Sequence, residues 1–260
     1  MKSEQTQRDV VLVLMAHPDD AEILCGGTLA LLAQNGWSVH IASATPGDCG
    51  SSTLPPMEIA AIRREEGASG ARVFGGTYHC LERRDLRVKY DEETIAAADG
   101  LLREVRPRLL ITHNPVDYML DHEQISLVAR AAAFNAAIPH APAPPGSCPM
   151  DGVPHLYYAD PVEGKDNFGD PVQPRLLVNV TETFETKLEA LAKHASQREW
   201  LRNHHGIDEY LESTKRWSAT RGALAGFEYA EGFRQHVGHG YPQDDLLADV
   251  FEGRVARYGA

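Results

Sequence analysis

Short apolar runs alternate with helix-like segments along the first 140 residues, and this alternation limits the fold more than any other feature of the chain. Residues 9–16 form a run of β-branched and aliphatic residues, the pattern of a strand buried on both faces of a parallel sheet. Further apolar runs at 38–44 and 109–112 are separated from it by helix-like segments. This repeated β-α rhythm predicts an α/β fold with a doubly wound, mostly parallel sheet, whose ligands bind at the carboxyl ends of strands.

We expect one domain over residues 1–260, because this length supports a single large α/β core. Residues 139–154 are rich in Pro, with Gly and Ser, and predict a surface loop. The region from about 200 to 260 is expected to be mainly helical and to pack on the same domain. The other expected helices cover 26–36, 57–70, 91–105, about 122–138 and 182–195, and the other expected strands cover 71–74, 77–81, 156–159 and 176–180.

The composition is that of a folded globular protein and disfavours several classes of partner. The chain has 25 Lys and Arg against 37 Asp and Glu, so its net charge of −12 gives no attraction for nucleic acid or anionic lipid. No early apolar run is long enough to span a bilayer, and no secretion signal is visible. The four cysteines form no CxxC pair, which predicts free thiols and a cytoplasmic location.

Imidazole and carboxylate side chains follow two of the expected strands. His17 and Asp20 lie in the loop after the first strand, and His122 lies beyond the strand at 109–112. If these strands are neighbours in the sheet, the three side chains supply the ligands of a catalytic zinc, which needs three protein ligands and one open position. Asp19 would then stand beside the attacking water as a general base.

The same residues also have purely structural explanations. An Asp-Asp pair after a strand is commonly a turn or a helix cap, and a single His is commonly a hydrogen-bonded loop residue. Asp121 fits the N-cap of a helix, because Gln124 follows it at the spacing of a capping box. The spacing of these residues therefore leaves both a metal site and a set of caps and turns open.

Two longer motifs bear on this choice. Residues 16–22 read Ala-His-Pro-Asp-Asp-Ala-Glu, and residues 25–30 read Cys-Gly-Gly-Thr-Leu-Ala. This stretch resembles the opening signature of the N-acetylglucosaminylphosphatidylinositol de-N-acetylase-like (LmbE-like, PIG-L type) zinc deacetylases. Further matches, between about residues 9 and 235, are Ile-Arg-Arg-Glu-Glu at 62–66, Arg-Asp at 84–85, Thr-His at 112–113, Asp-His at 121–122 and, more weakly, residues 228–233.

The resemblance implies a Rossmann-like, three-layer α/β/α fold. It also implies a hydrolase that removes N-acetyl groups from amino sugars or related amides with a single zinc. Carried over to this chain, it makes His17, Asp20 and His122 the metal ligands and Asp19 the general base. The products would be acetate and a free amine, with Asp19 taking a proton from the attacking water.

The resemblance also implies that Arg63 and Asp85 line the substrate site, although an exposed helix charge and a turn residue are alternative explanations for them. The chain departs from the family at Met119, where members commonly carry a His that helps to stabilise or protonate the tetrahedral intermediate. Methionine cannot donate a strong hydrogen bond or exchange a proton. Candidates for the vacant role are Tyr118, which is also a candidate substrate-binding residue, and His113, His140, His155, His236 and His239.

Other functions remain open at this stage. The metal could serve an amidase that acts on a larger or nonsugar conjugate, or a homologue that binds metal and has lost catalysis with the missing His. A dinucleotide-binding oxidoreductase needs a glycine-rich turn after the first strand, where this chain has carboxylates that would repel a pyrophosphate. We expect one divalent ion per chain, zinc or another such as iron, and a small N-acylated, sugar-like substrate. The Pro-rich loop is a candidate contact for a homo-oligomer.

Overall fold

The computed structural model describes residues 8–198 and 209–259, and eight strands in this part of the chain form one sheet in the order β3-β2-β1-β4-β5-β7-β6-β8. The strands are β1 (Val10–Met15), β2 (Ser38–Ser43), β3 (Thr77–Cys80), β4 (Leu109–Thr112), β5 (His155–Ala159), β6 (Leu176–Asn179), β7 (Ala230–Gln235) and β8 (Val255–Arg257). The α-helices are α1 (Asp20–Gln34), α2 (Pro56–Val73), α3 (Glu92–Val105), α4 (Leu120–Asn135), α5 (Phe184–Leu191), α7 (Glu209–Ala223) and α8 (Leu246–Val250). Two short 3-10 helices, η1 (Val162–Gly164) and η2 (Thr181–Thr183), complete the described elements.

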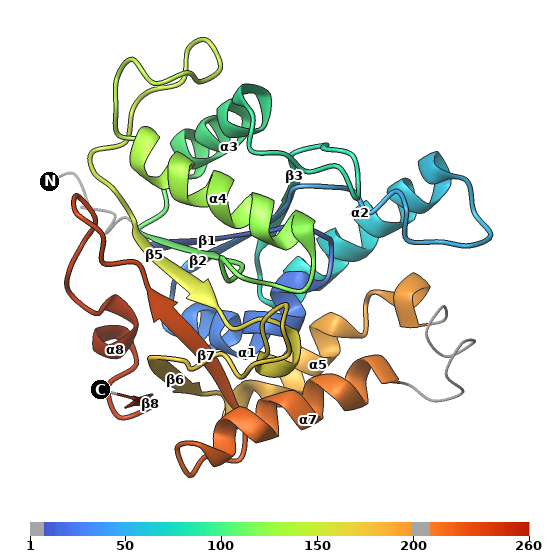
Figure 1. Cartoon of the computed structure of the whole chain (residues 1–260), viewed down its shortest axis with the longest axis vertical. Helices are drawn as coiled ribbons and strands as arrows, with labels where there is room; N and C mark the ends of the chain where they lie inside the picture. The colour runs from blue at the N-terminus through green and yellow to red at the C-terminus, as the bar shows by residue number, and fades with distance from the viewer. Residues whose placement is uncertain (1–7, 199–208, 260) are drawn as a thin grey trace, which may run out of the picture.

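The first five strands are parallel to one another, as the β-α rhythm predicts. β1 pairs with β2 on one side and with β4 on the other, so the strand with the most apolar sequence lies inside the sheet. Its residues alternate between two hydrophobic cores. Val11 and Val13 face the core with α1 and α5, whereas Leu12 and Leu14 face the core with α3 and α4. Helices therefore cover both faces of the sheet, which gives the three-layer α/β/α fold (Figure 1).

The last three strands of the sheet run antiparallel to their neighbours. β7 pairs with β5 and β6, and β6 pairs with β8. The region from about 200 onward is therefore not mainly helical as predicted, because its described part supplies β7 and β8 as well as α7 and α8. β7 buries a small residue and a charged residue, Gly232 and Glu231, and its sequence has no continuous apolar run. Residues 139–154 form no helix or strand.

A buried ion pair joins this C-terminal region to α1. Helix α1 starts at Asp20, earlier than predicted, and is kinked at Cys25, where φ is −144°. Beyond the kink, the backbone amides of Gly27 and Thr28 donate to the two carboxylate oxygens of Glu231, at 2.9 and 2.7 Å. Lys187 of α5 binds the same carboxylate at 2.7 Å. The Glu231 carboxylate thus acts as an N-terminal cap for the second half of α1.

The prediction of a strand at 71–74 is wrong. Helix α2 continues to Val73, and its end is marked by Gly75, whose φ of +66° suits a residue without a side chain. The strand β3 begins only at Thr77. Valine and phenylalanine near position 73 favour a strand locally, but Ala71 packs in the core beneath the sheet and keeps this turn helical.

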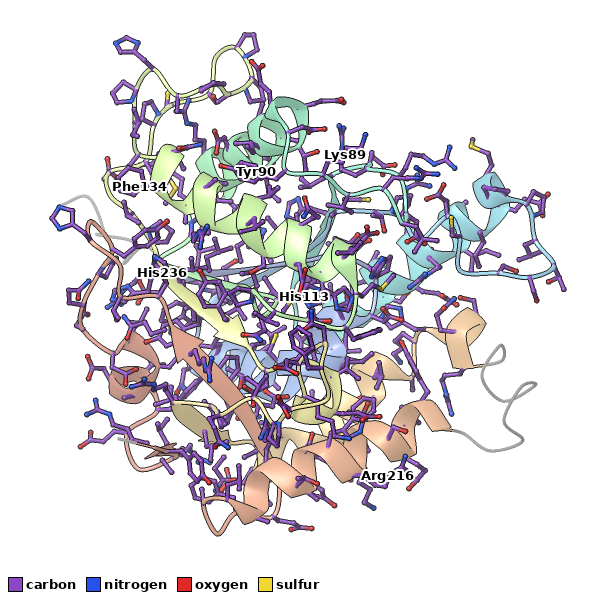
Figure 2. All side chains as sticks on the ribbon, in the orientation of Figure 1. Lys89, Tyr90, His113, Phe134, Arg216 and His236 are labelled. Atoms are coloured by element: carbon purple, nitrogen blue, oxygen red, sulfur yellow. The ribbon has the colours of Figure 1, made fainter. Side chains whose placement is uncertain are left out.

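The outer surface of the helix layers is polar with scattered apolar side chains. Helix α4 carries Phe134 on its outer side, where the ring is 42% exposed (Figure 2). Within the described residues, no helix combines the length and the apolar character that a bilayer crossing requires.

Candidate metal centre and active site

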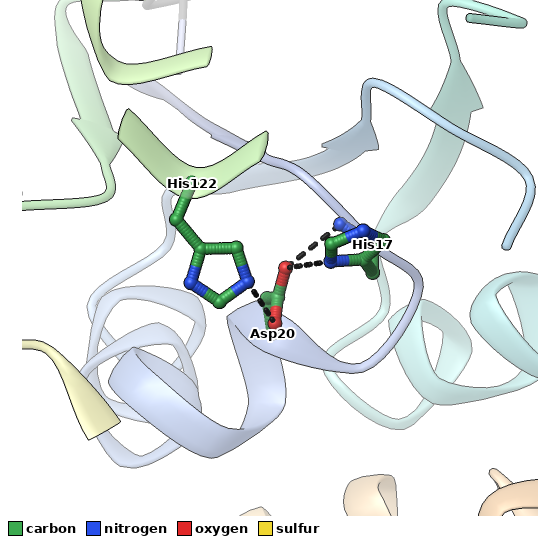
Figure 3. Close-up of side chains that lie close together, drawn as sticks. All are labelled: His17, Asp20 and His122. Carbon is green, nitrogen blue, oxygen red and sulfur yellow. Dashed lines mark hydrogen bonds and ion pairs between the residues drawn. The ribbon is translucent and has the colours of Figure 1, made fainter. Parts of the chain in front are cut away.

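The candidate site lies where β1 and β4 end side by side in the sheet. Leu14 of β1 pairs with Thr112 of β4, so the loops that leave these strands begin next to each other. His17 lies in the first loop, and Asp20 begins α1 directly after it. His122 lies in the first turn of α4, which follows β4. The three side chains converge from these elements, as Figure 3 shows.

His17, Asp20 and His122 lie close enough together to hold one cation. Each offers one ligand atom, and these atoms all lie within 4.8 Å of one another. The Asp20 oxygens lie 3.4 Å from His17 Nδ1 and 3.6 Å from His122 Nε2 (Figure 3). The His17 backbone amide donates to Asp20 Oδ2 at 2.7 Å and fixes the carboxylate. Two imidazole nitrogens and one carboxylate oxygen are a donor set that zinc accepts, so the residues present fit a divalent ion.

A second carboxylate stands behind each imidazole. Asp85 Oδ1 lies 3.1 Å from His17 Nε2, and Asp117 Oδ1 lies 2.9 Å from His122 Nδ1. A carboxylate on the far nitrogen of a histidine fixes the ring orientation and the tautomer that a metal ligand needs. Sequence reasoning missed Asp117. The available signal was an acidic residue in the loop between β4 and His122.

Asp121 is not an N-cap. Residue Met119 holds the N-cap position of α4, and Asp121 lies inside the first turn with its side chain turned away from the helix. Its carboxylate accepts hydrogen bonds from the backbone amides of Leu86 and Val88, at 2.7 and 3.2 Å, and lies 3.4 Å from His17 Nε2. Asp121 therefore ties the loop at 85–88 to α4 and adds a negative charge beside His17.

The charges of this cluster oppose the effect of burial. Burial would lower the pKa of His17, but hydrogen bonds to Asp121 and Asp20 raise it well above its usual value. Burial would raise the pKa of Asp20, but the charges of His122 and His113 hold it well below its usual value. Asp20 is therefore an anion that faces imidazole nitrogens, and protons compete with a cation for those nitrogens.

Asp19 occupies a strained and enclosed position beside the candidate metal ligands. Its φ is 114°, in the region that favours glycine, and the surrounding structure holds it there. The phenol of Tyr210, in α7, donates to Asp19 Oδ2 at 2.5 Å, and Arg63 Nη2 lies 3.4 Å from the same oxygen. Burial raises the pKa of Asp19, and the Arg63 charge counteracts this rise. Sequence reasoning missed Tyr210, because 191 residues separate it from Asp19.

Arg63 is not an exposed helix charge, since its residue is only 4% exposed. It extends from α2 across the loop after β1 and donates to the carbonyl oxygen of Pro18 at 2.8 Å. Gly47 makes room for it, because a Cβ atom there would lie 2.4 Å from Arg63 Nη1. The guanidinium thus supports the loop that carries Asp19.

The candidates for the role left by Met119 lie in different places. The His113 ring stacks on His122 with centroids 3.9 Å apart, is fully buried, and lies 3.1 Å from Asp20 through Nε2. Tyr118 is 62% exposed and meets the His122 ring edge-on at 5.3 Å. Figure 2 shows His113 at the centre of the molecule and His236 at its side, where His236 bonds Tyr158. His155 pairs with Asp244, and His140 and His239 are exposed.

A cavity of about 700 Å³ opens beside the Asp19 side of this site. We call it the α7 pocket, because residues of α7 form one wall and the segment around η1 forms another. Tyr118 and Tyr210 belong both to this pocket and to the site, since they contact His122 and Asp19. The pocket is lined by Ile23, Tyr118, Val162, Glu163, Lys165, Asp166, Gly169, Tyr210, Ser213, Thr214 and Trp217.

Comparison with known proteins finds similarity to one family of deacetylases and to a hydratase. The model of the GlcNAc-PI de-N-acetylase family, PIG-L, matches residues 12–133, which carry all the residues of the metal cluster. The chain is 27% identical to the diacetylchitobiose deacetylase of Thermococcus kodakarensis over 86% of its own length and 82% of that enzyme. It is also 23% identical to a 4-oxalmesaconate hydratase of Pseudomonas putida, over 75% of this chain and 77% of the hydratase.

The fold agrees with these similarities. The N,N′-diacetylchitobiose deacetylase of Pyrococcus horikoshii superimposes with a TM-score of 0.76 and 25% identity, covering 92% of this chain and 88% of that enzyme. The similarity to deacetylases thus extends beyond the matched 12–133 segment into the C-terminal region.

Proposed function

We propose that the chain is a member of the PIG-L, or LmbE-like, deacetylase family and that it is a metal-dependent N-deacetylase, which hydrolyses an N-acetylated amino sugar or a related amide. The observation that carries the proposal is the convergence of His17, Asp20 and His122 beside a supported Asp19. A cation site without a free carboxylate beside it can bind a ligand, whereas Asp19 beside this site also supplies a base for hydrolysis.

A zinc ion held by His17, Asp20 and His122 would supply a Lewis acid for the amide carbonyl and would lower the pKa of a water molecule. Asp19 accepts a proton from the attacking water as the water oxygen bonds to the carbonyl carbon of the amide. The same carboxyl group then returns the proton to the departing nitrogen, because an amide ion is too poor a leaving group. Acetate and a free amine result.

Two residues position Asp19 for these proton transfers. Tyr210 donates to one of its oxygens at 2.5 Å, and Arg63 approaches the same oxygen at 3.4 Å. Both contacts are to one oxygen, and we place the transferred proton on the other oxygen of Asp19. In the same way, Asp85 holds the imidazole of His17 and Asp117 holds the imidazole of His122. Arg63, Asp85 and Tyr118 remain our candidates for substrate contact, in addition to these supporting contacts.

The test is amine release from N-acetylglucosamine and its glycosides by zinc-loaded protein, with metal content measured in the same samples. We expect His122→Ala to lose both metal and activity, and Asp19→Asn to keep the metal and lose activity. His236→Ala is the matched control, because His236 lies away from the site and bonds Tyr158. Activity that survives both site substitutions would overturn the mechanism. Iron found at full occupancy in the purified protein would show that the metal is iron and not zinc.

A hydratase is the second candidate, because one relative is a 4-oxalmesaconate hydratase and because Met119 leaves the usual His position without a proton donor. Hydration adds water across a carbon-carbon double bond and releases no amine. An assay of 4-oxalmesaconate consumption beside the amine assay therefore separates the two reactions.

Other outcomes of these assays point to other functions. Stoichiometric zinc with neither activity would favour a binding protein. A nonsugar amidase would release amine from nonsugar amides. A cytoplasmic location and a homo-oligomer stay predictions.

A further inference from the structure

The α7 pocket is continuous with the general base. Tyr210 lines the pocket and donates to Asp19, and Tyr118 lines it and contacts the His122 ring. A substrate whose amide bond lies near Asp19 therefore has this pocket next to it, on the other side of the two tyrosines. At about 700 Å³, the cavity is much larger than an acetyl group needs.

The two walls of the pocket are fastened to each other. Arg221 of α7 donates to the carbonyl oxygens of Gly164 and Val172, at 3.3 and 2.9 Å, and its Nε lies 2.7 Å from Asp160. A Cβ atom on Gly164 would lie 2.3 Å from the Arg221 guanidinium, so the wall approaches α7 as closely as glycine allows. The cavity is therefore formed before any ligand arrives.

The hydroxyl groups of the α7 wall already have partners on their own helix. Ser213 Oγ accepts from Arg216 at 2.8 Å, and Thr214 Oγ1 donates to the carbonyl oxygen of Tyr210 at 3.0 Å. The surface that remains for a ligand includes the apolar side chains of Ile23 and Val162. The indole of Trp217 adds a flat face, on which a ring can stack.

The charges around the pocket disfavour an anion. Glu163 and Asp166 are acidic, and Lys165 is the single cation among the described residues that line the pocket. Lys165 Nζ already pairs with Glu163 at 3.1 Å. Among the described lining residues, a carboxylate or phosphate in the pocket would therefore meet no cation that lacks an acidic partner, in a chain whose net charge is −12.

The direction of the proton transfers decides which part of the substrate enters. Asp19 returns its proton to the departing nitrogen, so the nitrogen lies within hydrogen-bond reach of Asp19. Tyr210 joins Asp19 to the pocket on the same side. We propose that the α7 pocket binds the amine-side part of the substrate, and that this part is an uncharged group with an apolar ring face, such as the aglycone of an amino sugar. This inference rests on the proposed deacetylase function and specifies its substrate class.

The test compares three N-acetyl substrates on the zinc-loaded protein: N-acetylglucosamine, its phenyl β-glycoside and its 4-carboxyphenyl β-glycoside. We expect kcat/KM for the phenyl glycoside to exceed that of the parent sugar about tenfold through a lower KM, because the pocket buries the ring. The carboxyphenyl glycoside should lose this advantage. N-butyrylglucosamine, which lengthens the acyl side, should gain nothing over the parent sugar.

Two variants connect this preference to the pocket. Trp217→Ala should reduce the ratio of phenyl to parent kcat/KM to about twofold or less, because a stacked aromatic face is lost. Phe134→Ala, the matched control, should keep the ratio, because Phe134 lies on α4, on the other side of the molecule from Arg216 of α7 (Figure 2). Glu163→Gln should narrow the gap between the phenyl and carboxyphenyl glycosides, because it releases Lys165 from its pair.

The binding of phenyl β-glucoside, which has no amide, separates the two proposals. Calorimetry on the Asp19→Asn protein should detect binding that Trp217→Ala weakens. If this binding is seen but the zinc-loaded protein without substitutions hydrolyses no amide, the proposed function fails and the ligand class of the pocket stands. Three results would each overturn the inference. The carboxyphenyl glycoside could be turned over as well as or better than the phenyl glycoside, or Trp217→Ala could leave the ratio of phenyl to parent kcat/KM unchanged. The third is a gain with N-butyrylglucosamine instead of the phenyl glycoside.

Discussion

The region of residues 10–135 and the region of residues 155–257 supply the site in different ways. The first region carries the proposed metal ligands and Asp19 beyond the ends of the parallel strands β1 and β4, in the loops and first helical turns that follow them. The second region adds β5, which is parallel to β4, and then three antiparallel strands, and its helix α7 brings Tyr210 to Asp19 and Trp217 to the α7 pocket. The PIG-L family model matches only within the first region, at 12–133. The chemistry and the choice of substrate are therefore expected to depend on different halves of the chain.

The sharpest test of this division is Asp20→Ala in the first region. The substitution removes the carboxylate whose two oxygens face His17 and His122, and we expect loss of bound metal and a fall in kcat/KM of about a thousandfold or more. Metal content and initial rates on the same preparation check this. The exposed Asp249 of α8 provides the control Asp249→Ala, which should change neither quantity. An Asp20→Ala protein with full metal occupancy would contradict the ligand assignment.

The next largest effect should appear where the two regions join. Glu231→Ala leaves the buried Lys187 ammonium and the amides of Gly27 and Thr28 without their carboxylate. We expect a loss of about 3 kcal/mol or more in the free energy of unfolding, measured by denaturant titration. Glu182→Ala, which breaks the exposed pair with Arg254, should cost less than about 1 kcal/mol. Equal costs for the two variants would show that the join contributes no more than a surface contact.

The sequence predicts the first region better than the second because local patterns dominate there. The run at 9–16 and the motif at 16–22 predict β1 and the loop that carries His17, since a strand buried on both faces permits few other residues. Asp117 and Tyr210 were missed for different reasons. Asp117 acts through His122, and an acidic loop residue has no pattern of its own. Tyr210 meets Asp19 only after α7 has packed on the sheet, which no local spacing encodes.

The second region also misled the prediction of secondary structure. β7 contains Glu231 and Gly232, and its stability comes from hydrogen bonds to both neighbouring strands and from the Lys187 ion pair. A strand of this kind lacks the apolar alternation by which strands are recognised. The helical expectation for the last sixty residues therefore overlooked it.

A smaller effect should follow from Tyr210→Phe, which tests how the second region acts on the first. Loss of the phenol removes one hydrogen bond to the Asp19 carboxylate, and such bonds to a charged group contribute about 1.5–3 kcal/mol. We expect kcat to fall about tenfold with bound metal unchanged, since Tyr210 positions the base and does not touch the metal ligands. The control is Tyr90→Phe, because the Tyr90 ring is 53% exposed. A change in KM with unchanged kcat would make Tyr210 a binding residue and not a positioning one.

The smallest effect concerns a carboxyl group of the first region that has no part in the site. Asp99 of α3 is fully buried, and burial raises its pKa to about 7 against the opposing effects of Asn135 and Arg103. Between about pH 4 and pH 7 the folded chain keeps a proton that the unfolded chain has released, so stability should fall as pH rises through this range. Asp99→Asn removes the ionisation, and we expect it to flatten this slope and to gain about 1 kcal/mol at pH 7.5, measured by denaturant titration at several pH values.

The matched substitution Asp91→Asn has the opposite linkage and serves as the control. Hydrogen bonding from the Thr94 amide lowers the pKa of Asp91, so its contribution to stability is present above the unfolded pKa near 4 and is lost as pH falls further. Asparagine caps a helix about as well as aspartate, so Asp91→Asn should leave the slope between pH 4 and pH 7 unchanged. If Asp99→Asn also leaves it unchanged, the slope between pH 4 and pH 7 comes from other groups, and burial does not raise the pKa of Asp99 into this range.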